Sequence, residues 1–217
     1  MKQIIAIKQK LASFILASVL LLGLTSNALA AKTPDEVVRE TFDNVVSQIQ
    51  ANRGVYEKDS AALYAMLEEY LLPSLNIGFM VDLILGKELA TSTPASQHKE
   101  LVDEFKVLLL RTYASGILYA TGDDEVVYEK VDLAPDAYRA DLNVKLVTAN
   151  GGDFPIKLKM TTRNGRWSKE DSGQWRAYNL EVAGQNIARL YRATFARTLK
   201  EQGVEGLINN LRTKNTS

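Results

Sequence analysis

The order of apolar and polar residues divides the chain into a helical part followed by a part made of strands. From about residue 33 to about residue 118, apolar side chains recur every three or four positions, which predicts amphipathic helices. Thr33, Pro34 and Glu36 supply an N-terminal cap for the first helix, and Asn52 with Gly54 is expected to end it. Caps and breakers together separate four predicted helices, over about 33–53, 60–71, 76–85 and 93–118.

Beyond Gly122-Asp123-Asp124, apolar and polar side chains alternate. Asn150-Gly151-Gly152 is expected to form a hairpin turn between the two clearest strands, in which one face is apolar and the other carries the charges. This alternation is typical of an antiparallel sheet that is covered on one side. Strands are predicted over about 125–133, 138–148, 154–163 and 174–182, and helical spacing returns over about 185–200 and 204–211.

These elements predict an α+β fold in a single domain. A four-stranded antiparallel sheet is expected to be covered by about six to seven helices, with an apolar interior between the two layers. The domain is expected to span residues 31–217, with a helical part over about 31–121 and the sheet and C-terminal helices over about 122–212.

The first 30 residues have the three parts of a secretory signal peptide. Lys2, Lys8 and Lys10 precede an apolar run over 11–24, and Ala28-Leu29-Ala30 provides small residues for cleavage before Ala31. The alternative, an uncleaved membrane anchor, is disfavoured because the run is short for a bilayer. No cysteine follows it, so a lipid anchor is not expected. The mature domain is therefore expected to be soluble and to work outside the cytoplasm.

Composition and charge exclude several classes of function. Loss of three lysines and no acidic residue leaves 23 basic and 26 acidic side chains, which argues against nucleic-acid binding. The chain has no cysteine and a single histidine, His98, which is expected to be solvated, so a zinc site is not expected. No phosphate-binding loop, dinucleotide fingerprint or nucleophile elbow occurs.

Carboxylates for acid–base chemistry are also missing from the apolar face of the two clearest strands. Only Glu129 and Glu181, on the first and last predicted strands, are candidates to face inward. Enzymatic activity is therefore not expected. The apolar interior fits either an ordinary filled core or a cavity for an apolar ligand, and the pattern of residues leaves both open.

Three groups of residues, in order over about 75–212, resemble one known family. They are Gly78-Phe79-Met80 with Leu85-Gly86-Lys87, Thr93-Pro94, Gln97 and 105–114; the stretch 173–184 around Trp175; and Tyr191-Arg192, Phe195, Gly203, Leu207-Ile208 and Leu211. This order and spacing is similar to the MlaC or toluene-tolerance family, the periplasmic phospholipid-binding component of the Mla lipid-transport system. Three features depart from the family pattern: Leu89 in place of an aromatic residue, Asn179 in place of an acidic one, and a longer turn over 164–173.

The resemblance implies an NTF2-like fold whose cavity holds phospholipid tails and leaves the headgroup outside. It implies a monomeric periplasmic carrier, with phospholipid as cargo and no cofactor. Its partners would be an outer-membrane lipoprotein–porin complex and an inner-membrane ABC transporter with an MCE-domain ring, and its role would be to maintain outer-membrane lipid asymmetry. An NTF2-like periplasmic enzyme and a protein-interaction module with a filled interior are the alternatives.

Two sets of side chains are expected to contact the acyl chains, although each position also suits a plain core. The first set lies on the strands, and the second lies opposite, on the helices. The strand set is Leu142, Val144, Leu146, Ile156, Leu158, Met160 and Tyr178, and the helix set is Phe79, Leu83, Phe105, Leu109 and Tyr113.

Overall fold

The computed structural model describes most of the region that follows the predicted signal peptide. The described residues are 32–119, 125–129, 131–134, 136–147, 153–182 and 184–216. The predicted signal peptide and the turns predicted at 122–124 and 150–152 lie outside these ranges. None of the described helices combines the length and the apolar character that crossing a bilayer requires.

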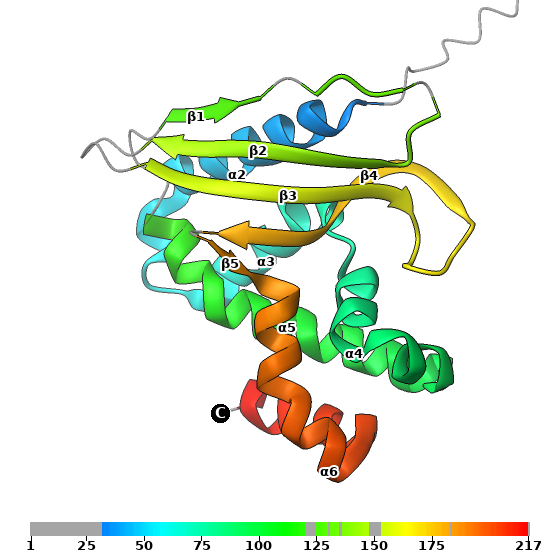
Figure 1. Cartoon of the computed structure of the whole chain (residues 1–217). Coiled ribbons are helices and arrows are strands. Elements are labelled where there is room, and N and C mark those ends of the chain that lie inside the picture. The colour runs from blue at the N-terminus through cyan, green and yellow to red at the C-terminus, as the bar shows by residue number, and fades with distance from the viewer. Residues whose placement is uncertain are drawn as a thin grey trace, which may run out of the picture. The chain divides into compact units, whose positions relative to one another are not determined.

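The helical part precedes the sheet, as the alternation pattern predicts (Figure 1). Its elements are α2 (Pro34–Tyr56), α3 (Ser60–Tyr70), the 3-10 turn η1 (Leu72–Ser74), α4 (Ile77–Ser92) and α5 (Ala95–Tyr119). The sheet and the last helix follow as β1 (Glu125–Tyr128), β2 (Arg139–Val147), β3 (Asp153–Arg163), β4 (Asp171–Val182), β5 (Gln185–Asn186) and α6 (Ile187–Thr216).

The α+β class is confirmed, but the sheet has five strands where four were predicted. The strands are antiparallel in the order β1-β2-β3-β4-β5, and β5 is a two-residue strand beside the end of β4. The first strand is shorter than the predicted 125–133, because regular pairing with β2 stops at Tyr128. On β2 the buried and exposed side chains alternate without interruption through Leu146, which confirms the predicted apolar and polar faces.

The start of the first helix is set by its cap, whereas tertiary packing extends some helices beyond the residues expected to end them. The carboxylate of Glu36 accepts a hydrogen bond from the backbone N–H of Thr33 at 2.8 Å, which confirms the predicted cap. The helix does not end at Asn52 as predicted; it kinks there and continues to Tyr56, whose side chain packs against the cluster that α2 forms with α3 and α5. Gly86 and Gly203 have positive φ angles of 77° and 67° and break α4 and α6 without ending them. The six to seven separate helices expected therefore become five helices in the described residues.

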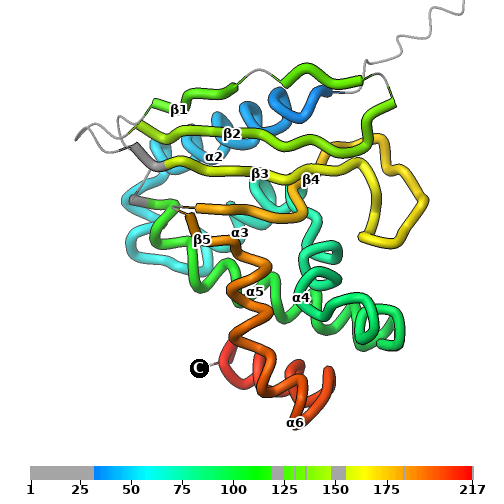
Figure 2. Tube along the Cα trace, viewed as in Figure 1, coloured from blue at the N-terminus to red at the C-terminus, as the bar shows by residue number. Residues whose placement is uncertain are grey.

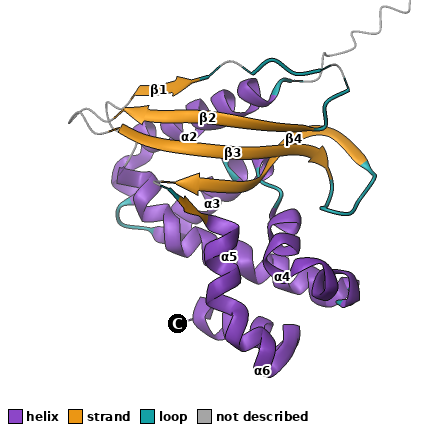
Figure 3. Ribbon diagram, viewed as in Figure 1, coloured by secondary structure: helices purple, strands orange, loops and turns teal. Residues whose placement is uncertain are grey.

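The helices form two groups around the sheet (Figures 2 and 3). The first half of α2 crosses one face of the sheet, where Val37 and Val38 pack against strand residues. Helices α4, α5 and α6 gather beyond the β4–β5 side and share a separate core. Leu75 and Leu180 pack against both the sheet core and this helical core, so the two are joined there.

Candidate functional site

The face of the sheet beneath α2 carries a continuous apolar cluster, here called the inner-face cluster. Strands β2 and β3 bring its members opposite one another, with Leu142 paired to Leu158 and Ala140 to Met160. Because side chains on a strand alternate between faces, each of these residues points to the same side of the sheet. The buried members are Ala140, Leu142, Val144, Leu158, Met160, Trp175 and Ala177.

The structure brings together most of the strand residues that were expected to contact acyl chains. Leu142, Val144, Leu158 and Met160 belong to the inner-face cluster, and Ile156 is half-buried against it. Leu146 is also buried, farther along β2. Leu142, Val144, Ile156, Leu158 and Met160 thus lie together on the face of the sheet that α2 crosses.

Three of the helix residues expected opposite the strands lie in a different cluster. Phe105 is fully buried among α4, α5 and α6, where its ring meets Tyr191 edge-on at a centroid distance of 5.0 Å. Leu109 and Tyr113 pack against the same helical core. The Phe105 face of α5 is therefore covered by α4 and α6, and α6 is a partner that the sequence pattern does not identify.

Phe79 and Tyr178 form a contact between α4 and the sheet. Their rings stack with centroids 4.2 Å apart. Tyr178 occupies a β-bulge, because Lys159 pairs with Asn179 while the next residue, Met160, pairs with Ala177. The bulge redirects the Tyr178 side chain, so simple alternation did not place it correctly. Leu83, the remaining predicted residue, is half-buried on α4.

At the β1 side the inner-face cluster ends in half-buried apolar residues, here called the β1 rim. Strand β1 pairs with β2 only, so it is the edge strand on this side of the described sheet. Half-burial of so many apolar side chains at one edge leaves apolar surface that a ligand could cover. The β1 rim consists of Val37 and Val38 on α2, Val126 and Tyr128 on β1, and Val131 and Leu133 after β1.

Sequence reasoning did not single out Tyr128, which combines an apolar position with an unpartnered polar atom. Its hydroxyl is buried and has no hydrogen-bond partner among the described residues. The guanidinium of Arg39, on α2, lies over its ring at 4.2 Å from the centroid. Burial and the nearby Asp43 carboxylate raise the pKa of Tyr128 to about 12, against a smaller lowering by Arg39. At neutral pH this hydroxyl therefore stays protonated, and no acceptor for it lies among the described residues.

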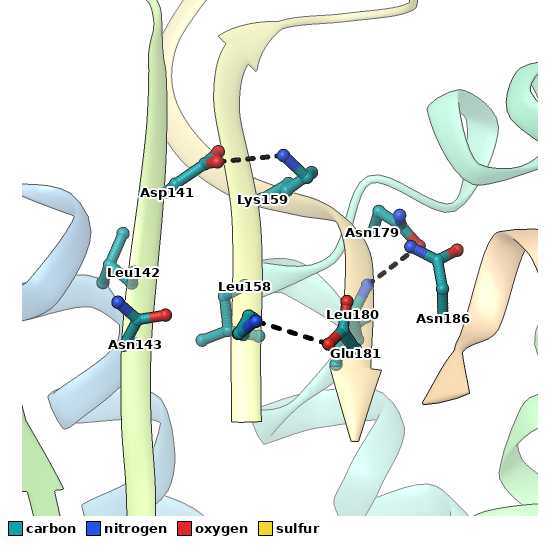
Figure 4. A pocket seen from close by; sticks show the side chains of 10 residues that line it. Asp141, Leu142, Asn143, Leu158, Lys159, Asn179, Leu180, Glu181 and Asn186 are labelled. Atoms are coloured by element: carbon teal, nitrogen blue, oxygen red, sulfur yellow. Dashed lines mark hydrogen bonds and ion pairs between the residues drawn. The ribbon is translucent and has the colours of Figure 1, made fainter. Parts of the chain in front are cut away.

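The outer face of the sheet has a hollow of about 260 Å³, but its lining is charged (Figure 4). Lys159 forms an ion pair with Asp141 at 2.9 Å, and Lys157 pairs with Glu181 at 3.5 Å. Opposite charges therefore balance across this hollow, and its polar lining does not suit acyl chains.

Neither of the two candidate inward carboxylates reaches the inner-face cluster. Glu129 is exposed and accepts a hydrogen bond from the Asn143 amide at 2.8 Å, and Glu181 belongs to the outer-face hollow. Among the described residues, no three His, Asp or Glu side chains come together in a way that could hold a metal ion.

The expectation that His98 is solvated is wrong. Its side chain is 26% exposed, and its Nε2 lies 3.0 Å from Oδ1 of Asp82, which is 9% exposed as a residue. The other oxygen of Asp82 accepts a hydrogen bond from the backbone N–H of Arg166 at 3.1 Å. The pair therefore joins α4, α5 and the loop between β3 and β4, which is a structural role that helical spacing does not show.

Comparison with known proteins gives consistent matches over most of the chain. A family model described as MlaC protein matches residues 39–213. The chain is 26% identical over 186 residues to toluene tolerance protein ttg2D of Pseudomonas putida, covering 85% of this chain and 81% of that one. It is 25% identical over 187 residues to the intermembrane phospholipid transport system binding protein MlaC of Haemophilus influenzae, covering 86% and 84% respectively.

A solved structure with a similar fold is a phospholipid-binding protein from Ralstonia solanacearum in complex with a phospholipid, with a TM-score of 0.73 and 19% sequence identity. The alignment covers 85% of this chain and 98% of that chain. At this level of identity, the match establishes the fold.

Proposed function

Because the chain belongs to the MlaC family, we propose that it is a soluble periplasmic phospholipid carrier that holds acyl chains against the inner-face cluster beneath α2. In this proposal the chain is a monomer with an NTF2-like curved sheet. It exchanges lipid with two partners, an outer-membrane lipoprotein–porin complex and an inner-membrane ABC transporter with an MCE-domain ring. By moving lipid between them it maintains outer-membrane lipid asymmetry.

The observation that carries the proposal is the incomplete cover of the apolar sheet face. The inner-face cluster is buried at its centre, and its residues become half-buried at the β1 rim. A core closed on all sides would have no route for a long apolar ligand, whereas an edge strand beside a helix can admit one. The named relatives, one of them a phospholipid transport binding protein, support lipid as that ligand.

The energetics of acyl-chain burial suit a carrier without a catalytic group. Burying acyl chain is worth about 0.8 kcal/mol per methylene, so two chains of about 15 methylenes gain on the order of 20 kcal/mol gross relative to water. A site as apolar as the bilayer makes exchange between membrane and carrier nearly neutral. Contact with a membrane partner can then decide the direction of transfer.

Organic extraction of the purified mature protein, followed by mass spectrometry, tests the proposal. About one phospholipid per chain is expected. A small polar molecule in its place would favour the enzyme alternative, and a protein that stays empty even after incubation with phospholipid vesicles would favour the interaction-module alternative.

A matched pair of substitutions then locates the acyl chains. Val144→Glu places a carboxylate on the inner face, where the native side chain is buried. Val127→Glu makes the same change on the outer face, at a position that is 42% exposed and pairs with Lys145. Lipid load should fall at least about tenfold in the first variant and stay unchanged in the second, because a carboxylate is costly to bury beside apolar chains.

Circular dichroism checks that each variant is folded before its lipid is counted. If Val144→Glu does not fold, Val144→Thr keeps the shape of the side chain and adds only a hydroxyl, and a reduction of a few-fold is expected. A folded inner-face variant that retains the wild-type load would show that acyl chains do not contact this face.

A further inference from the structure

One polar pair, Arg39 and Tyr128, lies at the β1 rim, with the Asp43 carboxylate close enough to raise the pKa of Tyr128. Tyr128 follows Val127 at the end of β1, and its ring packs against the inner-face cluster while its hydroxyl lacks a partner in the described residues. Arg39 stands on the first half of α2, next to Val37 and Val38, which contact the same cluster. The first half of α2 and strand β1 therefore place a cation and a hydroxyl donor at one edge of the apolar site.

Arg39 is not occupied by an acidic partner in the part of the chain that the structure describes. Asp43 lies one helical turn along α2, at the spacing where oppositely charged side chains commonly pair. The Arg39 guanidinium instead lies over the Tyr128 ring at 4.2 Å. A guanidinium on an aromatic face still presents its N–H groups at its edges, so it remains able to bind an anion.

These features identify the chemistry of a complementary ligand. It must be apolar where it meets the inner-face cluster, and it must offer oxygen acceptors where the cluster reaches the edge. A glycerophospholipid has this arrangement, because its ester oxygens and phosphodiester adjoin the acyl chains. Arginine binds phosphate through paired, charge-assisted hydrogen bonds, and a buried hydroxyl donor needs an acceptor. Since the pKa of Tyr128 is raised to about 12, its hydroxyl stays protonated at neutral pH.

We infer that Arg39 and Tyr128 bind the glycerophosphate end of the lipid, with Arg39 on the phosphate and the Tyr128 hydroxyl donating to an ester oxygen. This inference rests on the proposed carrier function and adds the position and orientation of the ligand. The tails lie inward beneath α2, and the headgroup emerges between α2 and β1. The Asp43 carboxylate is exposed to solvent, and solvent and salt screen its repulsion of the phosphate. The same screening weakens the direct contact between the Arg39 guanidinium and the phosphate less, because those two groups touch.

The test compares a ligand that has a phosphate with one that lacks it. Delipidated mature protein is incubated with vesicles made of an isotopically labelled carrier lipid. The vesicles contain either palmitoyl-oleoyl-phosphatidylethanolamine or dioleoylglycerol as the test lipid. Each bound species is then quantified by mass spectrometry. Arg39→Gln should weaken uptake of the phospholipid about tenfold and leave uptake of dioleoylglycerol unchanged. Arg189→Gln, at an exposed position on α6, is the matched control and should change neither.

Tyr128→Phe separates ligand binding from a purely structural role. The ester oxygens are common to both lipids, so uptake of both should fall a few-fold. The thermal midpoint of the delipidated variant should be unchanged or higher, because the substitution removes a buried hydroxyl without a partner.

The outcomes separate this inference from the function on which it rests. If wild-type protein takes up phospholipid and Arg39→Gln behaves like Arg189→Gln, the headgroup assignment is wrong and the carrier proposal stands. If wild-type protein takes up neither lipid, the carrier proposal itself is overturned, and the headgroup assignment fails with it.

Discussion

The buried carboxylate of Asp82 provides a direct test of how the loop between β3 and β4 is held. Its two oxygens accept hydrogen bonds from His98 Nε2 at 3.0 Å and from the backbone N–H of Arg166 at 3.1 Å. Asp82→Ala removes both acceptors at once. The Arg166 N–H then has to find water or remain unpaired, so the loop should lose its attachment to α4.

The magnitude follows from the two hydrogen bonds and the burial. A hydrogen bond to a charged group contributes about 1.5–3 kcal/mol, and water that reaches the released loop restores part of this. We expect Asp82→Ala to lower the free energy of unfolding by about 2–4 kcal/mol. For a domain of this size, that corresponds to a fall of roughly 5–15 °C in the thermal midpoint. His98→Ala removes only one of the two bonds and should cost about half as much.

Urea unfolding of the mature chain, followed by circular dichroism, measures these differences. Asp103→Ala is the matched control, because Asp103 also pairs with a basic side chain, Lys99, but is 50% exposed. An exposed pair of this kind contributes less than about 1 kcal/mol. If Asp82→Ala were no more destabilising than Asp103→Ala, the carboxylate would not attach the loop and the reasoning would be refuted.

Two further predictions concern backbone conformation and alkaline pH. Gly203→Ala should lower the free energy of unfolding by about 1–2 kcal/mol, because the φ of 67° at this position is strained for any L side chain. Gly116→Ala, in open space within α5, should raise it by about 0.5–1 kcal/mol. Equal effects of the two substitutions in urea unfolding would contradict this. Burial raises the pKa of both Tyr113 and Tyr128 to about 12. The contribution of these two tyrosines to the free energy of unfolding should therefore be unchanged near neutral pH and fall between about pH 10 and 12, because the tyrosines of the unfolded chain ionise first. Tyr128→Phe should reduce this loss of stability between about pH 10 and 12. An absorbance titration of the folded protein at about 295 nm follows tyrosine ionisation, and ionisation of every tyrosine near pH 10 would refute the assignment.

The faces of β2 and β3 could be predicted because a strand has a fixed geometric repeat. Leu142 and Leu158 fall on one face and Asp141 and Lys159 on the other, whatever the rest of the fold does. A bulge breaks that rule at Tyr178, because one extra residue in β4 shifts the positions on either side of it to opposite faces. Whether a bulge forms there depends on how β4 pairs with β3, which alternation does not show. The apolar face of the sheet was therefore predictable on β2 and β3 and less so on β4.

The assignment of helix faces to partners was less successful for a related reason. Helical spacing shows that the Phe105 face of α5 is apolar, but a wide apolar face can be covered by a sheet or by another helix. In the structure it is covered by α6, through Tyr191 and Phe195. The same limitation hid the partner of His98, because Asp82 is 16 residues away in the chain.

The sequence by itself determined the class of fold, the cap of the first helix, the apolar face of the sheet and the family. The first three depend on local chemistry or on a short repeat, such as the cap at Thr33 and the alternation of two along β2, and the family follows from the order of motifs along the chain. Only the tertiary structure decided that this face stays partly open at β1 and that Arg39 meets Tyr128 there. Those contacts join residues from separate elements, and their existence depends on how α2 packs across the sheet, which no local pattern encodes.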